Sequence, residues 1–562
     1  MDRGKPDIHD DFERCDANES KQVAEKPIKG SVHPLPEGVQ TLGQYMVGNV
    51  LTRKDTVFSW IGVAVMFFVV MIPTVNQTIL AYFTTELKQD CGLTIAQYGL
   101  LSGYANGLVY AFASLILGYC VDHLNWPRTW LLVAANVLLA GMYVLEGMAT
   151  NFGMLLAAVM IAAVGGSVHL TMSVSLVSDL LPPNRVSLGQ AFIFTGEAVA
   201  VVLAGNLSYA FKSHGISWRA APLGLAVAAF LVAVAIAVLI REPKKGCFIV
   251  QKAQANGGSG AQEFKLGEAL AYMANMRTFW MITVGLGIRM NAGHLVLGYM
   301  PPFQAIMFPK EAALDATFAT IVGVFAFLSS VIIGAICEMQ IQKRPWMALY
   351  TGAFGGVIGG AFFVLSIWAR PIAKQHSGYA LMLVCVALGA LFANGATGPL
   401  AALMTLILPP EIKSFGLSVF EFVSFLLGPM YSVVMAVGLQ AISARNQKRY
   451  SGVSIDGTGP SSKLTANKRT LVAACIMLAI GLVAALVGGA IFFLWASWGI
   501  RHDIAKQKRR ADGTAEAERV PRRRKVLLWL GIALLLVLVF FLLIISLIAS
   551  FNPNTVQSQH HG

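Results

Sequence analysis

Five ionisable side chains stand inside long apolar runs of the sequence and are the first candidates for chemistry: Arg289, Glu197, Glu421, His169 and His294. Ionisable groups are costly in such surroundings and usually face a cavity or a partner. Arg289 lies about eleven residues into its run, which is roughly 16 Å along a helix at 1.5 Å per residue. A permanent cation at that depth suits a carboxylate or phosphate group of a ligand. The alternative is a structural ion pair with Glu197 or Glu421.

The two glutamates continue polar stripes along their predicted helices. Glu197 shares a helical face with Gln190, and Glu421 follows Ser414 and Ser418 on one face. Such stripes either line a water path or hydrogen-bond neighbouring helices, and the sequence leaves both interpretations open. Because a desolvated carboxylate favours its protonated form, each glutamate is also a candidate carrier of a coupling proton.

The remaining polar positions of interest are two histidines and a short segment around Asn394. His169 and His294 can titrate near neutral pH, although a lone histidine on an apolar helix is commonly a packing residue. Asn394 and Thr397 are i,i+3 neighbours beside two glycines and a proline. A segment that kinks so easily suits a cavity wall or a gate.

Two loop patterns occur twice in the chain. In the first, a glycine at the end of an apolar run is followed four residues later by a carboxylate and ten residues later by an arginine. The copies are Gly118, Asp122 and Arg128, and Gly334, Glu338 and Arg344. The second pattern, LPPxxxSxG, begins at Leu181 and again at Leu408, an offset of 227 residues against 216 for the first pair. Two matched loops indicate an internal duplication.

The carboxylate of the first loop is a candidate gating residue. Asp122 would be costly to bury unpaired, so it should meet a base or a helix N-terminus. A contact to the neighbouring helical bundle, with Arg128 holding the loop, would close one face of the protein in one conformation and break in the other. A static cap at the membrane surface is the alternative. The repetition of the pattern at Glu338 and Arg344 favours the latch.

The composition requires these residues to be carried by membrane-spanning helices. The 562 residues are 56% hydrophobic and only 13% charged, with a mean hydropathy of +0.64. The apolar runs reach the ~20 residues that a helix needs to cross a bilayer and lack the alternation of a barrel strand. We therefore expect an all-α membrane protein. The formal charge of +13 does not indicate nucleic-acid binding, because its densest cluster, Lys506 to Lys525, lies between two apolar runs and fits a topology signal.

The runs fall into two groups of six with one run left over. The predicted domains are a disordered cytosolic tail at 1–56, a six-helix bundle at 57–240, a cytosolic linker at 241–276, a second bundle at 277–499, a basic cytosolic segment at 500–525, an extra helix at 526–550 and an outer tail at 551–562. Lys and Arg are concentrated in the loops that would be inside if the N-terminus were cytosolic. The extra helix has no polar face, so it is either a lipid-facing anchor or a subunit contact.

The first repeated loop resembles the signature of the major facilitator superfamily, G-x-x-x-D-R/K-x-G-R/K-R/K. Gly118 and Asp122 match it, whereas His123 replaces the base and Arg128 is displaced. The resemblance implies two six-helix bundles around a central cavity lined by helices 1, 4, 7 and 10. It thereby implies Asn76, His169, Arg289 and Asn394 as a substrate-binding set, to which the polar position His294 is added.

Shorter motifs resemble the Spinster-type lipid transporters within this superfamily. They are Trp218-Arg219 at the start of the sixth run and Arg241 to Gly246 after its end. Spinster-like proteins carry an Asp-Arg pair in helix 1, where this sequence has Asn76, Gln77 and Thr78.

The expectation for function is a secondary transporter that works by alternating access. The expected cargo is a small organic solute, by preference an anion, or a lysolipid-like amphiphile, with proton coupling as an option, in a plasma or endolysosomal membrane. No cofactor or metal is expected, because the sequence has neither a Walker-type loop nor paired metal-ligand spacings. The alternatives are a non-transporting receptor or scaffold, and an intramembrane lipid-modifying enzyme, for which no G-x-S-x-G motif is found.

Overall fold

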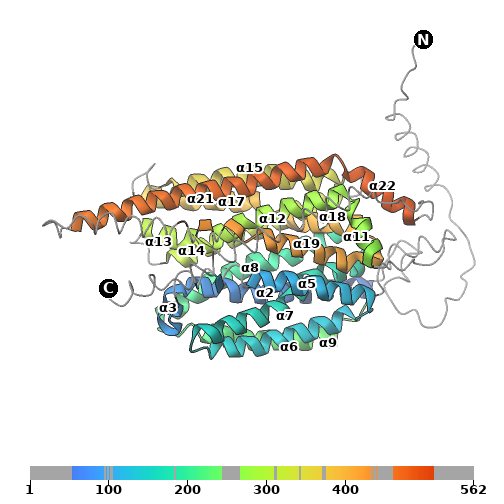
Figure 1. Ribbon diagram of the computed structural model, residues 1–562, viewed down its shortest axis with the longest axis horizontal. Coiled ribbons are helices and arrows are strands. Elements are labelled where there is room, and N and C mark those ends of the chain that lie inside the picture. The colour runs from blue at the N-terminus through green and yellow to red at the C-terminus, as the bar shows by residue number, and fades with distance from the viewer. Residues whose placement is uncertain are drawn as a thin grey trace, which may run out of the picture.

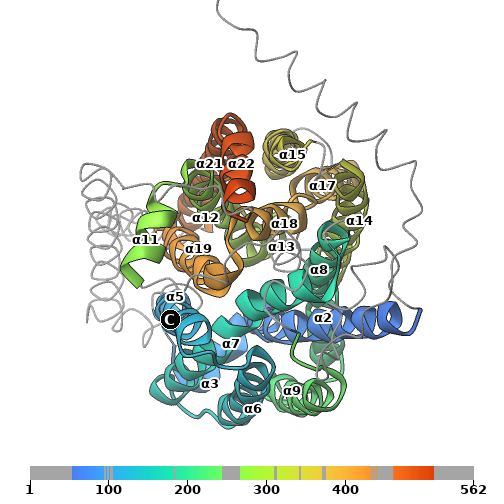
Figure 2. The ribbon, with the colours of Figure 1, turned by 90° about the vertical axis from the view of Figure 1, so that its right-hand side faces the viewer.

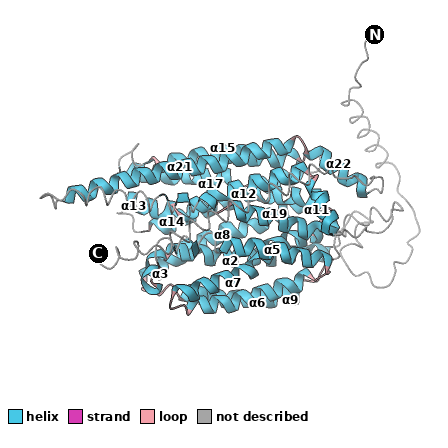
Figure 3. Ribbon diagram, in the orientation of Figure 1, coloured by secondary structure: helices cyan, strands magenta, loops and turns pink. Residues whose placement is uncertain are grey.

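The computed structural model describes residues 53–93, 97, 100–101, 106–182, 185–243, 266–308, 313–340, 344–369, 375–431, 434–435, 438 and 460–511. The regular elements in these residues are all helical, which confirms the predicted fold class (Figure 3). The tail before residue 53, most of the linker and the extra run 526–550 lie outside the described residues, so the expectations for them stay predictions.

The long helices form two groups that lie side by side (Figures 1 and 2). The N-terminal half consists of α2 (Arg53–Tyr82), α5 (Asn106–His123), α6 (Arg128–Gly147), α7 (Phe152–Leu180), α8 (Val186–Ser213) and α9 (Ala220–Leu239). The C-terminal half consists of α12 (Arg277–Gly298), α14 (Leu314–Gln340), α15 (Trp346–Ile367), α17 (Gln375–Ala393) with α18 (Thr397–Ile407), α19 (Lys413–Leu427) and α21 (Pro460–Ser497). The shorter elements are α3 (Thr84–Cys91), α11 (Leu266–Ala274), α13 (Met300–Met307), η3 (Pro410–Ile412) and α22 (Ile500–Ala511).

Nine spans in the described part of the chain are long and apolar enough to cross a membrane, with α17 and α18 counted as one. The helices α5, α12 and α19 complete the two groups of six. The two ends of the bundle are named here after one residue each. The Asp122 end, on the right in Figure 1, holds α11 and α22, and the Asp90 end, on the left, holds α3 and α13.

The predicted tenth span is interrupted in its middle. The chain leaves the helix after Ala393 and re-enters it at Thr397, where α18 begins. The Asn394 side chain donates through Nδ2 to the carbonyl of Ala390 at 3.0 Å, and Thr397 Oγ1 donates to the carbonyl of Asn394 at 3.3 Å. The helix is therefore broken at the segment in which the two glycines and the proline favoured a kink.

Small residues bring the two halves into close contact along two helix pairs, α5 with α19 and α8 with α14. A Cβ atom added to Gly118 would lie 1.9 Å from Ser418 Oγ, and one added to Gly334 would lie 2.4 Å from Ala191 Cβ. No larger residue fits at either position without displacing its neighbour. The glycines of the two repeated loops therefore hold equivalent places, one in each half.

The LPPxxxSxG loops also fold alike. A Cβ atom added to Gly189 would lie 2.2 Å from Leu181 Cδ1, and one added to Gly416 would lie 2.7 Å from Leu408 Cδ2. In each loop the first leucine therefore packs on the last glycine. In both repeated patterns the glycines therefore make matching contacts in the two halves, as expected from an internal duplication.

Candidate functional site

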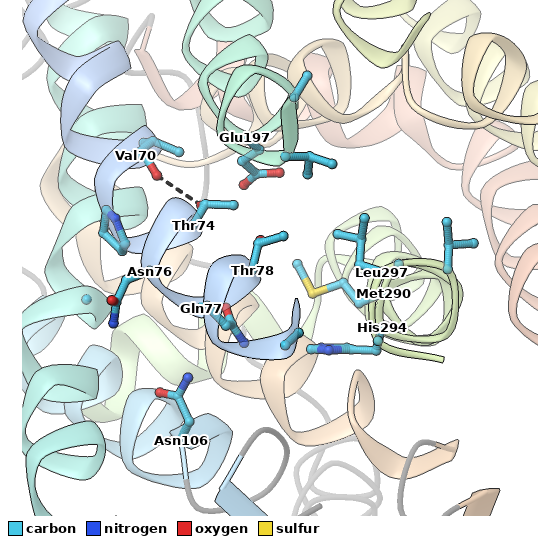
Figure 4. Close-up of a pocket in the computed structure, with 18 of the residues that line it drawn as sticks. Val70, Thr74, Asn76, Gln77, Thr78, Asn106, Glu197, Met290, His294 and Leu297 are labelled. Carbon is cyan, nitrogen blue, oxygen red and sulfur yellow. Dashed lines mark hydrogen bonds between the residues drawn. The ribbon is translucent and has the colours of Figure 1, made fainter. Parts of the chain in front are cut away.

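A cavity of about 590 Å³ lies between the two halves and takes its wall from both. All five residues predicted to bind substrate line it, namely Asn76, His169, Arg289, His294 and Asn394. Figure 4 shows Thr78 on α2, Glu197 on α8 and His294 on α12 around one space, with Asn76 on the other side of α2. The apolar part of the wall includes leucine, valine and phenylalanine side chains from both halves.

Arg289 lines the cavity from near the middle of α12 and is a permanent cation. Its Nη1 donates to the Gly352 carbonyl on α15 at 2.9 Å, and its Nη2 is buried with no hydrogen-bond partner in the described part of the chain. Gly356 also lies beside the guanidinium, since a Cβ atom there would be in ordinary contact with Nη1 at 3.8 Å. No ion pair between described residues includes Arg289, so the alternative of a structural pair with Glu197 or Glu421 is not realised.

The two histidines differ in their surroundings. The His169 side chain on α7 is buried, and neither of its ring nitrogens has a hydrogen-bond partner among the described residues. His294 on α12 is half-buried and projects from the opposite wall of the cavity toward α2 (Figure 4). A neutral imidazole at either place can donate a hydrogen bond to a bound molecule or accept one from it.

The two candidate proton carriers are separated by the structure. Glu197 lines the cavity and is half-buried. Glu421 is 2% exposed and lies beside Tyr110 and Thr171 from the other half. Its Oε2 has no hydrogen-bond partner in the described residues. The stripe that leads to Glu421 therefore faces the neighbouring helices, whereas Glu197 faces the open space.

A third carboxylate was missed by the sequence reasoning. Glu146 on α6 lines the cavity, is fully buried and accepts a hydrogen bond of 2.9 Å from Asn76 Nδ2. It is the only acidic residue in the apolar run 127–148, which is the signal that could have revealed it. Its position near the end of that run made it resemble an ordinary surface residue.

Both repeated carboxylates lie at the N-terminus of a helix in the opposite half. Asp122 Oδ2 accepts from the backbone N–H of Phe415, the third residue of α19, at 2.7 Å. Glu338 lies beside the backbone N–H of Leu188, the third residue of α8. Free N–H groups and the helix dipole make each N-terminus a site for a carboxylate. The structure thus places Asp122 across the interface between the halves, as expected of a latch.

Arg128 has a different environment from the one predicted. It does not simply hold its own loop, because it is buried at 1% exposure and bonds to another helix and to the chain after α9. Its acceptors are Asp179 at 2.7 Å, Glu242 at 2.8 Å, Ser175 at 3.0 Å and the Pro243 carbonyl at 3.0 Å. Burial alone would raise the pKa of Glu242, but the Arg128 charge and the hydrogen bonds from Thr129 outweigh it and lower that pKa. Arg128 therefore joins α6, α7 and the end of α9.

The same Asp179 carboxylate also reaches the opposite half, which the sequence reasoning did not foresee. Its Oδ1 accepts from Lys413 Nζ of α19 at 2.8 Å, and both side chains are at most 4% exposed. Nearby, the hydroxyl oxygens of Ser175 and Ser414 lie 3.2 Å apart. The two halves are thus joined at the Asp122 end by a buried ionic network. In the second copy Arg344 is exposed and therefore holds no equivalent buried place.

Comparison with known proteins agrees with this architecture. The sequence matches the family model of the Major Facilitator Superfamily over residues 60–432. The chain belongs to this superfamily. It is therefore a multi-pass integral membrane protein of a transporter family, and the wider of the two resemblances seen in the sequence is confirmed.

Individual relatives in the superfamily are distant. The chain is 24% identical to a chloramphenicol resistance protein of Streptomyces lividans over 351 residues, which cover 59% of this chain and 85% of that protein. It resembles the crystal structure of a bacterial homologue of the human lysosomal transporter Spinster in an inward-facing, unoccupied conformation, with a TM-score of 0.51, 16% identity and coverage of 80% and 97%. It also resembles the fucose:proton symporter of E. coli, with a TM-score of 0.54, 14% identity and coverage of 79% and 99%. At these identities the likeness concerns the fold.

Within the superfamily signature, this member departs at the base after Asp122. His123 occupies that position and stacks on Tyr119, with ring centroids 4.2 Å apart. The basic residues that reach the described network at this end are instead Arg128 and Lys413. At this end the described network therefore takes its basic groups from residues other than the one that follows Asp122.

Proposed function

We propose that this superfamily member is a secondary transporter that carries a small organic solute by alternating access. The cavity between the halves supports this function, because rocking of two bundles about a central site exposes the site to each side in turn. The bonds from Asp122 and Asp179 to α19 cross the interface and close the Asp122 end. With the N-terminus cytosolic, this is the cytosolic end.

The substrate class that fits best bears a negative group. The observation that carries this assignment is the Arg289 guanidinium, which lines the cavity, has no ion pair among the described residues and keeps one buried nitrogen without an acceptor. A carboxylate or phosphate oxygen supplies both the charge and the acceptor. The leucine and valine side chains of the wall can hold an apolar portion, so organic anions and lysolipid-like amphiphiles both qualify.

Uptake into proteoliposomes tests the proposal. A panel of labelled organic acids, lysophospholipids and neutral sugars should show saturable uptake of at least one anionic compound. Arg289→Met should lower that uptake about tenfold or more, the loss expected when a hydrogen bond to a charged group is removed. Arg277→Met is the matched control on the same helix, because Arg277 lies at its start with its guanidinium over the Trp495 ring.

The outcomes separate the candidates. Equal losses in the two variants would contradict a binding role for Arg289. Binding of an anion by the purified protein without any uptake would favour the receptor, and chemical change of the lipids would favour the enzyme. Uptake of neutral sugars alone would leave the transporter in place and remove the anionic substrate class.

A further inference from the structure

In the pair formed by Glu146 and Asn76, two buried oxygens have no hydrogen-bond donor among the described residues. Asn76 Nδ2 donates to Glu146 Oε2 at 2.9 Å. The remaining two oxygens, Glu146 Oε1 and Asn76 Oδ1, are both buried and have no hydrogen-bond partner among the described residues. An ionised carboxylate offers about four acceptor sites, and here one donor is present. Neither unpartnered oxygen can satisfy the other, because both are acceptors.

No charged group of the described residues is paired with Glu146. The titratable side chains that line the cavity with it include Tyr110, Tyr143, His169, Glu197, Arg289 and His294. Arg289 is the permanent cation among them, and it lies in the other half, where it donates to the Gly352 carbonyl. Arg219, whose guanidinium reaches the Ala149 carbonyl, is paired with Asp90. No ion pair between described residues includes Glu146. A buried anion with one hydrogen bond and no counter-charge is strongly disfavoured.

We propose that Glu146 is a proton-binding site, with Asn76 as its hydrogen-bonding partner. A proton on Oε1 converts that oxygen into a donor, and Asn76 Oδ1 is the acceptor that the pair offers. The acid and the amide then exchange two hydrogen bonds, and each of their four polar atoms has a partner. The site differs from the two carboxylates expected from the sequence, Glu197 and Glu421, neither of which has such a side-chain amide partner among the hydrogen bonds of the described residues.

The position of the pair connects the proton to the cavity. Both side chains line the cavity, so release of the proton adds one negative charge to its wall. Only Gly147 follows Glu146 in α6, so the site lies near the Asp90 end and exchanges its proton with that side. An anion would bind best when Glu146 is protonated. The proton and the anion would therefore travel together, an inference that rests on the proposed function.

Infrared difference spectroscopy on the purified full-length protein tests proton binding without transport. The wild type should show a carboxylic-acid carbonyl band that disappears as pH is raised, and Glu146→Gln should lack that band. Glu197→Gln, the matched change across the cavity, should retain it. A band that persists unchanged in Glu146→Gln would overturn the proposal, as would a wild type with no protonated carboxyl between pH 5 and pH 9, roughly the range available to a coupling site.

A second variant covers the case in which Glu146→Gln does not fold. Asn76→Ala keeps the carboxyl group and removes its partner, so the band should remain while its midpoint moves by roughly half a pH unit or more. An unmoved midpoint would show that Asn76 does not stabilise either form, and it would overturn the pairing.

Proteoliposome uptake distinguishes this proposal from the proposed function. Wild-type anion uptake should rise as the pH on the Asp90 side is lowered, whereas Glu146→Gln, which resembles the protonated state, should be insensitive to pH. A titrating band in a protein that moves no solute would preserve the proton site and refute the transporter. Uptake that stays equally pH-dependent in Glu146→Gln would preserve the transporter and refute the proton site.

Discussion

Replacing Lys413 by methionine should loosen the contact between the halves at the Asp122 end. The Lys413 ammonium lies 2.8 Å from Asp179 Oδ1, and the two side chains are 4% and 2% exposed. Removing one partner of an isolated buried ion pair costs roughly 3–5 kcal/mol. Asp179 keeps its bond to Arg128, so the loss is closer to that of one hydrogen bond to a charged group, about 2 kcal/mol. Opening at this end should become roughly 30-fold more favourable.

Amide hydrogen exchange measured by mass spectrometry reports this opening directly. The N–H of Phe415 bonds to Asp122 in the closed state and loses that bond when the halves separate. Peptides that cover the N-terminus of α19 should therefore exchange faster in Lys413→Met. The increase should approach the calculated factor where exchange follows the equilibrium population of the open form.

The matched control is the lysine–aspartate contact at the Asp90 end. Lys212 and Asp315 also join the two halves, but they lie 3.4 Å apart with side chains 36% and 31% exposed. Such a contact is worth at most about 1 kcal/mol, so Lys212→Met should change opening less than about fivefold and leave exchange at α19 unaltered. Equal exchange at α19 in wild type and Lys413→Met would refute the assignment of a latch to this network.

Two further substitutions test other contacts of the fold. Gly118→Ala should lower the free energy of unfolding by about 1–3 kcal/mol, because its new methyl group would overlap Ser418. Gly141→Ala, with open space around it, should be nearly neutral in the same thermal unfolding assay. Equal effects of the two substitutions would contradict the close approach of α5 and α19. Asp90 has a lowered pKa because the Trp218 indole and then Arg219 donate hydrogen bonds to its carboxylate. Its contribution, at most about 1 kcal/mol for so exposed a group, is present above its ordinary value of 3.8 and fades as pH falls through the lower folded value. Wild type and Asp90→Asn should therefore differ in melting temperature at pH 7 and converge in acid, and a constant difference would argue against this origin.

The sequence predicted the repeated backbone contacts better than the charged ones. The carboxylates Asp122 and Glu338 could be placed because their partners are helix N-termini, which every helix supplies regardless of its side chains. The cavity wall was foreseen through Asn76 and Arg289, since polar residues in apolar helices have few other places to lie. The Asp179–Lys413 pair could not be foreseen, because nothing local to either residue indicates its partner 234 positions away. Glu146 was missed for a different reason, because its place near the end of its apolar run made it resemble a surface residue.

The two copies of the LPPxxxSxG repeat join the halves in different ways at the Asp122 end. In the LPPxxxSxG repeats, Leu406 stands at the position of Asp179, and Val186 stands at the position of Lys413. These two apolar residues pack in one hydrophobic cluster, so these two positions join the halves without an ion pair. The contact between apolar side chains weakens gradually as they separate, whereas a buried ion pair is lost within a short displacement. The energy that resists opening is therefore concentrated on the α7–α19 side, and a change at Leu406 should affect exchange at α19 far less than Lys413→Met does.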